Sequence, residues 1–236
     1  KGQEIHNELV NRDMLLNDIV LGTSLVNMYA KCGMVDKAQE VLESLPVRNI
    51  VSWNALIAGY VQQGRFDEAM NCFQHMQSEG FSPNAVTYTS LLKVCACTKD
   101  MDKGKNIHIE TRCKGLLKND IVIGNALIDM YSKCGAFSEA RKVFCNLPTR
   151  NVVSWSALIS GYVQYGEDHE ALSCFEQMLS EGLSPNEVTY IGILNACGNA
   201  RDIRKGTQIH KEIVSRGLLK SNTALGTALI DMYAKC

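Results

Sequence analysis

The most constraining feature of this chain is a stretch of eleven residues that the sequence repeats. NALIDMYSKCG begins at Asn125, TSLVNMYAKCG begins at Thr23, and TALIDMYAKC begins at Thr227. The three copies start 102 residues apart in both intervals. A fixed recurrence of this kind predicts an array whose units pack against their neighbours, rather than one or two ordinary globular domains.

The long period divides into three shorter units. Residues 50–84 and 152–186 resemble each other along 35 residues, from VSWNALIAGY and VSWSALISGY to a shared SPN ending. Units of 36 and 31 residues complete the period. The resulting division has a partial unit at 1–18, six complete units at 19–49, 50–84, 85–120, 121–151, 152–186 and 187–222, and a partial unit at 223–236.

Each complete unit predicts two antiparallel helices. In 50–84 the first half carries apolar residues at helical spacing and is broken by Gly64. The second half carries Ala69, Phe73 and Met76 at i, i+4 and i+7, and ends near Gly80. The predicted fold class is all-α: a right-handed superhelical α-solenoid of antiparallel helix-turn-helix repeats.

Small residues share one position in the second predicted helix, where we expect helices to approach closely. They are Ala38, Ala69, Gly104, Ala140, Ala171 and Gly206. Cysteines also recur with the period and are expected to be reduced packing residues rather than a disulfide framework. They are Cys32, Cys134 and Cys236, Cys72 and Cys174, and Cys95 and Cys197.

Composition and motifs argue against several functional classes. The 24 basic and 25 acidic residues balance, and no run of eighteen apolar residues predicts a membrane span. No signal or transit peptide opens the chain, and both ends fall inside a unit, so we expect a piece of a longer protein. Paired CxxC motifs, phosphate loops and nucleophile motifs are absent from the sequence, so we expect no metal site, no cofactor and no catalytic residue.

One partial enzyme motif recurs. H-x-E triplets begin at His6, His108 and His210, as in the first half of a zinc deaminase signature. None is followed by P-C-x-x-C, and all three share one repeat position. We interpret them as part of the repeat architecture, on a helix surface.

Polar residues occupy two informative positions of each unit. The fifth residue is Thr23, Asn54, Thr89, Asn125, Ser156, Ile191 or Thr227, and the last is Asn49, Asn84, Asp120, Asn151, Asn186 or Asn222. Asn, Thr and Ser are weak helix formers, so an apolar packing helix would not favour them at the fifth position. The last position has a plain structural alternative, because Asn and Asp are good N-caps.

The motifs VSWNALIAGY, AVTYTSLLKVC, EALSCFEQMLSEGLSPN and NALIDMYSKCG resemble the pentatricopeptide repeat family. The 35-, 36- and 31-residue units are similar to the P, L and S motifs of its plant PLS subclass. That resemblance covers essentially the whole chain, with S units at 19–49 and 121–151, P units at 50–84 and 152–186, and L units at 85–120 and 187–222. The tetratricopeptide consensus is only partly met, which leaves a protein-binding scaffold as the alternative.

The resemblance implies binding of single-stranded RNA, with the fifth and last residues of one unit reading one base. Carried over, Thr23/Asn49 and Ser156/Asn186 resemble adenine pairs, Asn54/Asn84 and Asn125/Asn151 pyrimidine pairs, and Thr89/Asp120 a guanine pair. The Asn54/Asn84 pair leans to cytosine, and Ile191/Asn222 departs from the pattern. The implied core is 5′-A-Y-(G)-Y-A-3′.

The same resemblance implies roles for residues at two further positions of the units. The second residue of each unit, which wedges between bases in the family, is Val20, Val51, Val86, Val122, Val153 or Val188. Its structural alternative is core packing at a helix start. Lys31, Lys133 and Lys235 match the family's phosphate-contacting lysine, with solvated surface lysines as the alternative.

Wider implications concern the whole protein from which these repeats would come. The subclass chiefly specifies sites of cytidine-to-uridine editing in organelles, which implies a mitochondrial or chloroplast location. Its chemistry is carried by a C-terminal deaminase domain or a partner, and editing cofactor proteins are further expected partners. We also expect self-association through exposed repeat ends, because terminal repeats are normally capped.

Overall fold

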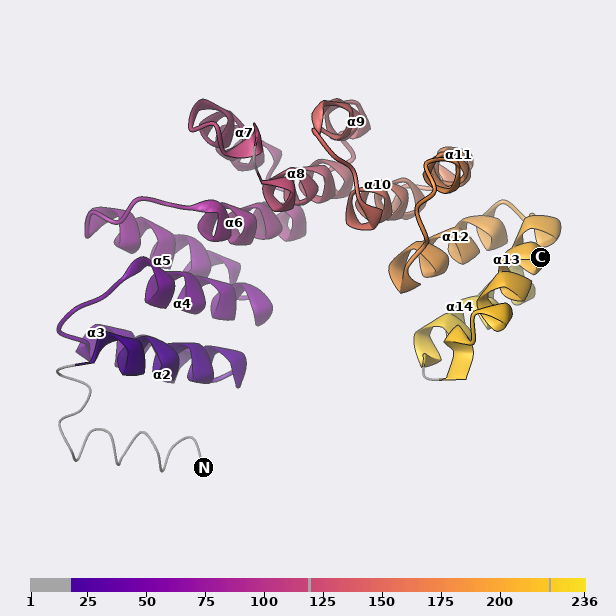
Figure 1. Ribbon diagram of the computed structural model, residues 1–236. Coiled ribbons are helices and arrows are strands. Elements are labelled where there is room, and N and C mark those ends of the chain that lie inside the picture. The colour runs from indigo at the N-terminus through magenta and orange to yellow at the C-terminus, as the bar shows by residue number, and fades with distance from the viewer. Residues whose placement is uncertain (1–17, 119, 221) are drawn as a thin grey trace. The chain divides into compact units, whose positions relative to one another are not determined.

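The computed structural model describes residues 18–118, 120–220 and 222–236, and within these ranges every regular element is helical (Figure 1). The all-α prediction is therefore confirmed. The partial unit at 1–18, including the triplet at His6, lies outside the described residues except for Asp18.

Helices alternate between a first and a second member of each hairpin. The first helices are α2 (Ile19–Lys31), α4 (Ile50–Gln62), α6 (Ala85–Thr98), α8 (Ile121–Lys133), α10 (Val152–Gln164), α12 (Glu187–Asn199) and α14 (Thr223–Lys235). The second helices are α3 (Val35–Ser44), α5 (Phe66–Ser78), α7 (Met101–Cys113), α9 (Phe137–Asn146), α11 (Asp168–Ser180) and α13 (Ile203–Ser215). Short 3₁₀ turns, η2 (Leu116–Lys118) and η3 (Leu218–Lys220), follow α7 and α13. Each first helix begins at the residue where the sequence division begins a unit.

The described residues divide into two compact units, residues 18–98 and residues 99–236. In the first, α2, α4 and α6 pack in series, and α3 and α5 each contact their own first helix and the next one. In the second, α8, α10, α12 and α14 pack in series, with α9, α11 and α13 placed in the same way. Within each compact unit, the described helices contact members of their own hairpin and of neighbouring hairpins, as expected of a solenoid.

Left-handed backbone lets the chain reverse after a first helix, at a glycine in the 31- and 35-residue units and at Lys99 and Arg201 in the 36-residue units. Gly64 has φ 72° and Gly166 has φ 77°, a conformation that costs little only without a side chain. The Arg65 backbone N–H then donates to the Tyr60 carbonyl at 2.9 Å, and that of Glu167 donates to the Tyr162 carbonyl at 2.9 Å. These bonds close the first helix and start the second helix antiparallel to it.

The core lies between first helices and along one face of the second helices. Trp53, Ile57, Trp155 and Ile159 are almost completely buried, and burial of one such side chain contributes roughly 1.5–3 kcal/mol. The shared small position is buried as expected. Ala38, Ala69, Ala140 and Ala171 are 0% exposed, and Gly104 and Gly206 are also buried.

The cysteines of the described residues form no disulfide, and those that recur with the period divide into two groups. Cys72, Cys95, Cys174 and Cys197 are buried, and burial raises the pKa of the Cys72 and Cys197 thiols to about 12. Cys32 and Cys236 are exposed, and Cys134 is half-buried. We expected Cys32, Cys134 and Cys236 to pack inside a helix. That prediction is wrong for Cys32, because Cys32 follows the last residue of α2 and caps the C-terminus of that helix.

Candidate nucleic-acid interface

Each first helix among the described residues starts directly after an Asn or Asp whose side chain caps it. Asn49 Oδ1 accepts a hydrogen bond from the Ser52 N–H at 2.8 Å, and Asp120 Oδ1 accepts one from the Val122 N–H at 2.8 Å. The remaining caps are Asp18, Asn84, Asn151, Asn186 and Asn222. The capping alternative is therefore correct as a statement of local structure, since these oxygens satisfy N–H groups that a helix start leaves open.

The same caps also touch the fifth residue of their own unit. Nδ2 of Asn49 donates to the Thr23 hydroxyl at 3.1 Å, and Nδ2 of Asn54 donates to Asn84 Oδ1 at 3.1 Å. The bond from Asn125 Nδ2 to Asn151 Oδ1 is 3.4 Å, and that from the Ser156 hydroxyl to Asn186 Oδ1 is 3.2 Å. Four of the predicted recognition pairs are thus brought together.

The other pairs behave differently. Thr89 and Asp120 lie in different compact units, and the Thr89 hydroxyl donates to the Ala85 carbonyl of its own helix at 2.7 Å. Ile191 is half-buried, and Asn222 caps α14 through the Leu225 N–H at 3.0 Å. Thr227 is exposed, and its hydroxyl donates to the Thr223 carbonyl at 3.0 Å.

Three of the fifth residues are more deeply placed than a freely presented side chain would be. Asn54 is 7% exposed, Asn125 8% and Ser156 5%. Their cap partners Asn84 and Asn186 are half-buried. The groups that remain available to a ligand are therefore few, and which atoms they are is decided by the hydrogen bonds within each pair.

Capping determines which side-chain atom of a unit's last residue, Oδ1 or Nδ2, remains available to a ligand. Asn84 Oδ1 accepts from the Val86 N–H, the Thr87 N–H and Asn54 Nδ2, each at 3.1 Å. The described residues offer Asn84 Nδ2 no hydrogen-bond partner, and the same holds for Nδ2 of Asn151 and Asn186. An asparagine cap of this kind can present N–H donors, whereas an aspartate cap such as Asp120 keeps a second carboxylate oxygen as an acceptor.

A residue of the next helix joins three of these pairs, and the sequence reasoning missed it. The Thr87 hydroxyl lies 2.7 Å from Asn54 Oδ1, the Ser154 hydroxyl 2.6 Å from Asn125 Oδ1, and the Thr189 hydroxyl 2.7 Å from the Ser156 hydroxyl. All three hydroxyl residues are at most 1% exposed. The available signal was a Ser or Thr three residues after every Asn cap except Asn222, which is a capping-box pattern.

The valines at the second position are exposed beside the caps. They are Val20, Val51, Val86, Val122, Val153 and Val188, with exposed fractions from 49% at Val153 to 67% at Val20. The core-packing alternative does not describe them. One accessible aliphatic side chain stands next to each cap and is available for contact with a ligand.

The lysines differ in their charge environment. Nζ of Lys133 lies 2.8 Å from a carboxylate oxygen of Asp129, and Nζ of Lys235 lies 2.6 Å from one of Asp231. Lys31 is exposed, and Asn27 occupies the equivalent place four residues before it. Two of the three predicted phosphate contacts are therefore already paired within their own helix.

The histidine triplets have structural partners. Nδ1 of His108 lies 2.9 Å from the Tyr131 hydroxyl, and Nδ1 of His210 lies 2.9 Å from the Tyr233 hydroxyl. Burial, followed by the charge of Arg112, lowers the pKa of His108 and favours its neutral form. Within the described ranges, no three His, Cys, Asp or Glu side chains gather as metal ligands.

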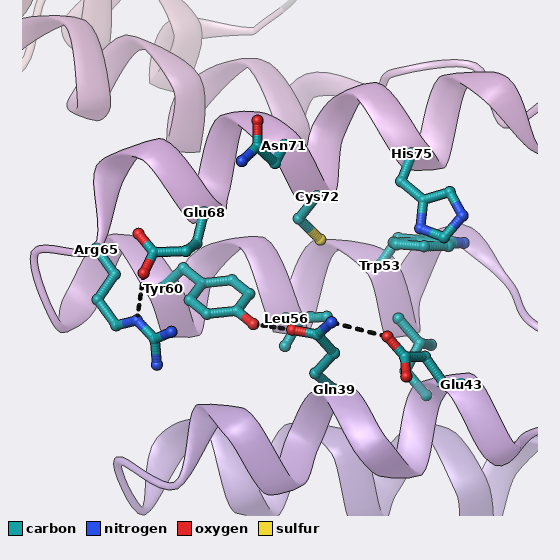
Figure 2. Close-up of a pocket in the computed structure, with 11 residues that line it drawn as sticks. Gln39, Glu43, Trp53, Leu56, Tyr60, Arg65, Glu68, Asn71, Cys72 and His75 are labelled. Atoms are coloured by element: carbon teal, nitrogen blue, oxygen red, sulfur yellow. Dashed lines mark hydrogen bonds and ion pairs between the residues drawn. The ribbon is translucent and has the colours of Figure 1, made fainter.

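A cavity of about 250 Å³ lies among α3, α4 and α5. Figure 2 shows residues that line it, Gln39, Trp53, Tyr60 and His75 among them. The predicted recognition, stacking and phosphate residues do not line it. One period later the longer Arg141 and Phe144 replace Gln39 and Leu42. Arg141 reaches Cys174 Sγ at 3.9 Å, and the Phe144 ring lies 4.5 Å from that of Trp155. The second compact unit thus carries larger side chains at the positions equivalent to Gln39 and Leu42.

None of the described helices combines the length and apolar character that a membrane crossing requires.

A family model for the PPR repeat family matches residues 48–97 and 150–199. A model of the single PPR repeat matches residues 23–50, 86–116, 125–152 and 188–218.

Relatives with similar sequences carry the same repeats. The chain is 37% identical over 235 residues to the chloroplastic pentatricopeptide repeat-containing protein At4g18520 of Arabidopsis thaliana, and 37% identical over 233 residues to the mitochondrial protein At3g09040 of the same plant. These alignments take in 100% and 98% of this chain but span only 38% and 22% of those proteins.

Solved structures show a similar fold. The pentatricopeptide repeat protein PPR10 from maize matches with a TM-score of 0.66 at 22% identity, over 90% of this chain and 31% of that one. PPR10 in complex with an 18-nt psaJ RNA element matches with a TM-score of 0.78 at 22% identity, over 94% of this chain and 34% of that one.

Proposed function

Because the chain belongs to the pentatricopeptide repeat family, we propose that it binds single-stranded RNA and reads one base with each recognition pair. The observation that carries this proposal is the repeated pairing of a fifth residue with the cap of the next helix. Four such pairs recur, each beside an exposed valine. A similar fold in a protein solved with an RNA element adds support.

Each pair offers a short polar pattern on a rigid support. The cap is fixed by the helix that it starts, and the fifth residue is fixed by burial and by its bond to the cap. A base held there would meet N–H donors from an Asn cap and contact the adjacent valine through its face. Stacking-type contacts contribute roughly 1–3 kcal/mol per base without selecting a sequence.

The proposed core site is 5′-A-Y-(G)-Y-A-3′, read by Thr23/Asn49, Asn54/Asn84, Thr89/Asp120, Asn125/Asn151 and Ser156/Asn186. The guanine is in parentheses because the L-type unit that contains Thr89 resembles a motif type that reads bases poorly in the family. Ile191 has no hydrogen-bonding group, so its unit spaces rather than reads. Lys31, Lys133 and Lys235 complete the proposed interface by contacting phosphates.

In the whole protein, these repeats would select the site for an organellar RNA editing or processing factor. The PLS-like order of unit lengths supports this role, and the chloroplastic and mitochondrial relatives support a location in one of these organelles. The chemistry would belong to a cytidine deaminase domain in another part of the protein or on a partner. Editing cofactor proteins and self-association through repeat ends are further proposed contacts.

A change of base preference tests the proposal. The double substitution Asn125→Thr with Asn151→Asp converts one pyrimidine-type pair to the guanine type and retains a capping residue. In fluorescence anisotropy with A-Y-G-Y-A oligonucleotides, we expect the preference at the second pyrimidine to move to guanine by about tenfold, which corresponds to roughly 1.4 kcal/mol.

The matched control places the same two changes on exposed positions of second helices, as Asn106→Thr with Asn146→Asp. This control should leave the base preference as in the parent chain. Equal affinities for all oligonucleotides in the parent chain and in both variants would contradict base reading, and would favour the protein-binding scaffold.

A further inference from the structure

We propose that the buried hydroxyl at the third position of the following unit is a positioning residue that sets which pyrimidine each asparagine pair prefers. The residues are Thr87 for the Asn54 pair and Ser154 for the Asn125 pair. The inference rests on the proposed function and adds a third residue to each of these two sites.

A directed chain of hydrogen bonds fixes the direction of this hydroxyl. The Asn84 backbone N–H donates to the Thr87 hydroxyl oxygen at 3.2 Å, and that hydroxyl lies 2.7 Å from Asn54 Oδ1. In the next asparagine pair, the Asn151 backbone N–H donates to the Ser154 oxygen at 3.3 Å, and the Ser154 hydroxyl lies 2.6 Å from Asn125 Oδ1. The hydroxyl oxygen accepts from the cap, so its single proton can be donated. The cap oxygens Asn84 Oδ1, at 3.1 Å, and Asn151 Oδ1, at 3.2 Å, are also within reach, but the amide oxygen of the fifth residue is the nearer acceptor in both sites.

This donation selects one orientation of the asparagine amide. With Oδ1 facing the hydroxyl, Nδ2 of Asn54 donates to Asn84 Oδ1. A rotation by 180° would place Oδ1 against the oxygen of the cap, and that hydrogen bond would be lost. The hydroxyl would also have to give up its short bond to Oδ1 and turn its proton to the more distant cap oxygen. Both asparagines are less than 9% exposed, so water would replace these bonds poorly.

Amide orientation matters most for telling the two pyrimidines apart. Cytosine presents an amino donor and a ring-nitrogen acceptor where uracil presents a carbonyl acceptor and an N–H donor. Turning an amide over exchanges its donor and acceptor in the same way. An amide free to turn would satisfy either base, whereas a fixed amide favours one of them.

This hydroxyl follows four of the five complete units that have a polar fifth residue. Ser52, Thr87, Ser154 and Thr189 follow units with Thr, Asn or Ser at the fifth position. The units containing Thr89 and Ile191 are followed instead by the apolar Ile123 and Leu225, both at most 1% exposed. Ile191 cannot use an orienting hydroxyl, and none follows it.

Crossed substitutions in the whole 236-residue chain test the inference. Thr87→Val keeps the shape of threonine without its hydroxyl, and Ser154→Ala removes the other hydroxyl. Binding is measured by anisotropy with four oligonucleotides that carry cytosine or uracil at the first and second pyrimidine positions. We expect Thr87→Val to reduce the cytosine-to-uracil affinity ratio at the first position by about three- to tenfold, as loss of one hydrogen bond would, and to leave the second ratio unchanged.

Ser154→Ala should do the reverse, so each variant serves as the control for the other. Thr87→Ser should restore the ratio, and Thr98→Val should leave it unchanged, because the Thr98 hydroxyl bonds only to the Val94 carbonyl of its own helix. Thermal melting shows whether each variant remains folded at the assay temperature.

A parent chain that binds cytosine and uracil equally at both positions would overturn the inference, even if purines are rejected. So would a Thr87→Val variant that melts like Thr87→Ser and retains the parent ratio. A parent chain indifferent to every base change would instead contradict the proposed function itself, which keeps the two failures distinct.

Discussion

A single asparagine at the start of a first helix takes part in both folding and proposed recognition. Oδ1 of Asn84 accepts from two backbone N–H groups of α6, while its Nδ2 has no bonding partner in the described structure. Its two functions therefore reside on different atoms of one amide. A substitution that changes one atom and keeps the other should separate them.

The substitutions Asn84→Asp and Asn84→Ala make this separation. Aspartate still caps α6 but presents an oxygen instead of an N–H donor, so the free energy of unfolding should change little while the base preference at the first pyrimidine changes. Alanine should lose the cap, at a cost of about 1 kcal/mol, and also lose the preference. Urea denaturation and anisotropy measure the two effects. Equal destabilisation by both variants would show that the cap needs the amide itself.

Some glycines of the first helices lie where two neighbouring helices approach closely. A Cβ added at Gly161 of α10 would overlap the Cβ of Ser132 in α8, with the Ser132 Cα 3.3 Å away. Because these atoms are close to the backbone, neither can turn aside. At Gly226 of α14, by contrast, an added Cβ would meet nothing within 4 Å.

We therefore expect Gly161→Ala to destabilise the fold by about 1–3 kcal/mol through overpacking. Gly226→Ala is the matched control and should stabilise it by up to about 1 kcal/mol, because alanine is the better helix former. Urea or thermal unfolding measures both. A Gly161→Ala variant as stable as the control would mean that α8 and α10 can move apart without loss.

The starts of the first helices were the most predictable part of the fold, because a 3.6-residue pattern, a glycine break and an Asn or Asp cap recur in each unit. The pairing of Asn54 with Asn84 followed from family resemblance. The Thr87 hydroxyl did not, because its partner lies 33 residues away and the contact exists only once two hairpins stack. The exposure of Cys32 was also missed, since a recurring cysteine does not show whether it packs or ends a helix.

At the scale of the whole molecule, electrostatics should contribute little to RNA affinity. The net charge is −1, and Lys133 and Lys235 are each paired with an aspartate four residues earlier. A lysine already neutralised by its own helix releases fewer counterions when it meets a phosphate. Contacts with base edges and base faces would then carry most of the binding free energy.

This balance predicts a shallow salt dependence that one pair of substitutions makes steeper. Three free lysines would give a slope of log K against log salt concentration of about −2 on a single strand. We expect the parent chain to fall below this magnitude, near about −1, and Asp129→Asn with Asp231→Asn to approach the full value. Glu40→Gln with Asp67→Asn changes the net charge equally on exposed residues of second helices and should leave the slope unchanged. If this control steepens the slope as much as the paired aspartates do, overall charge rather than the released lysines governs binding.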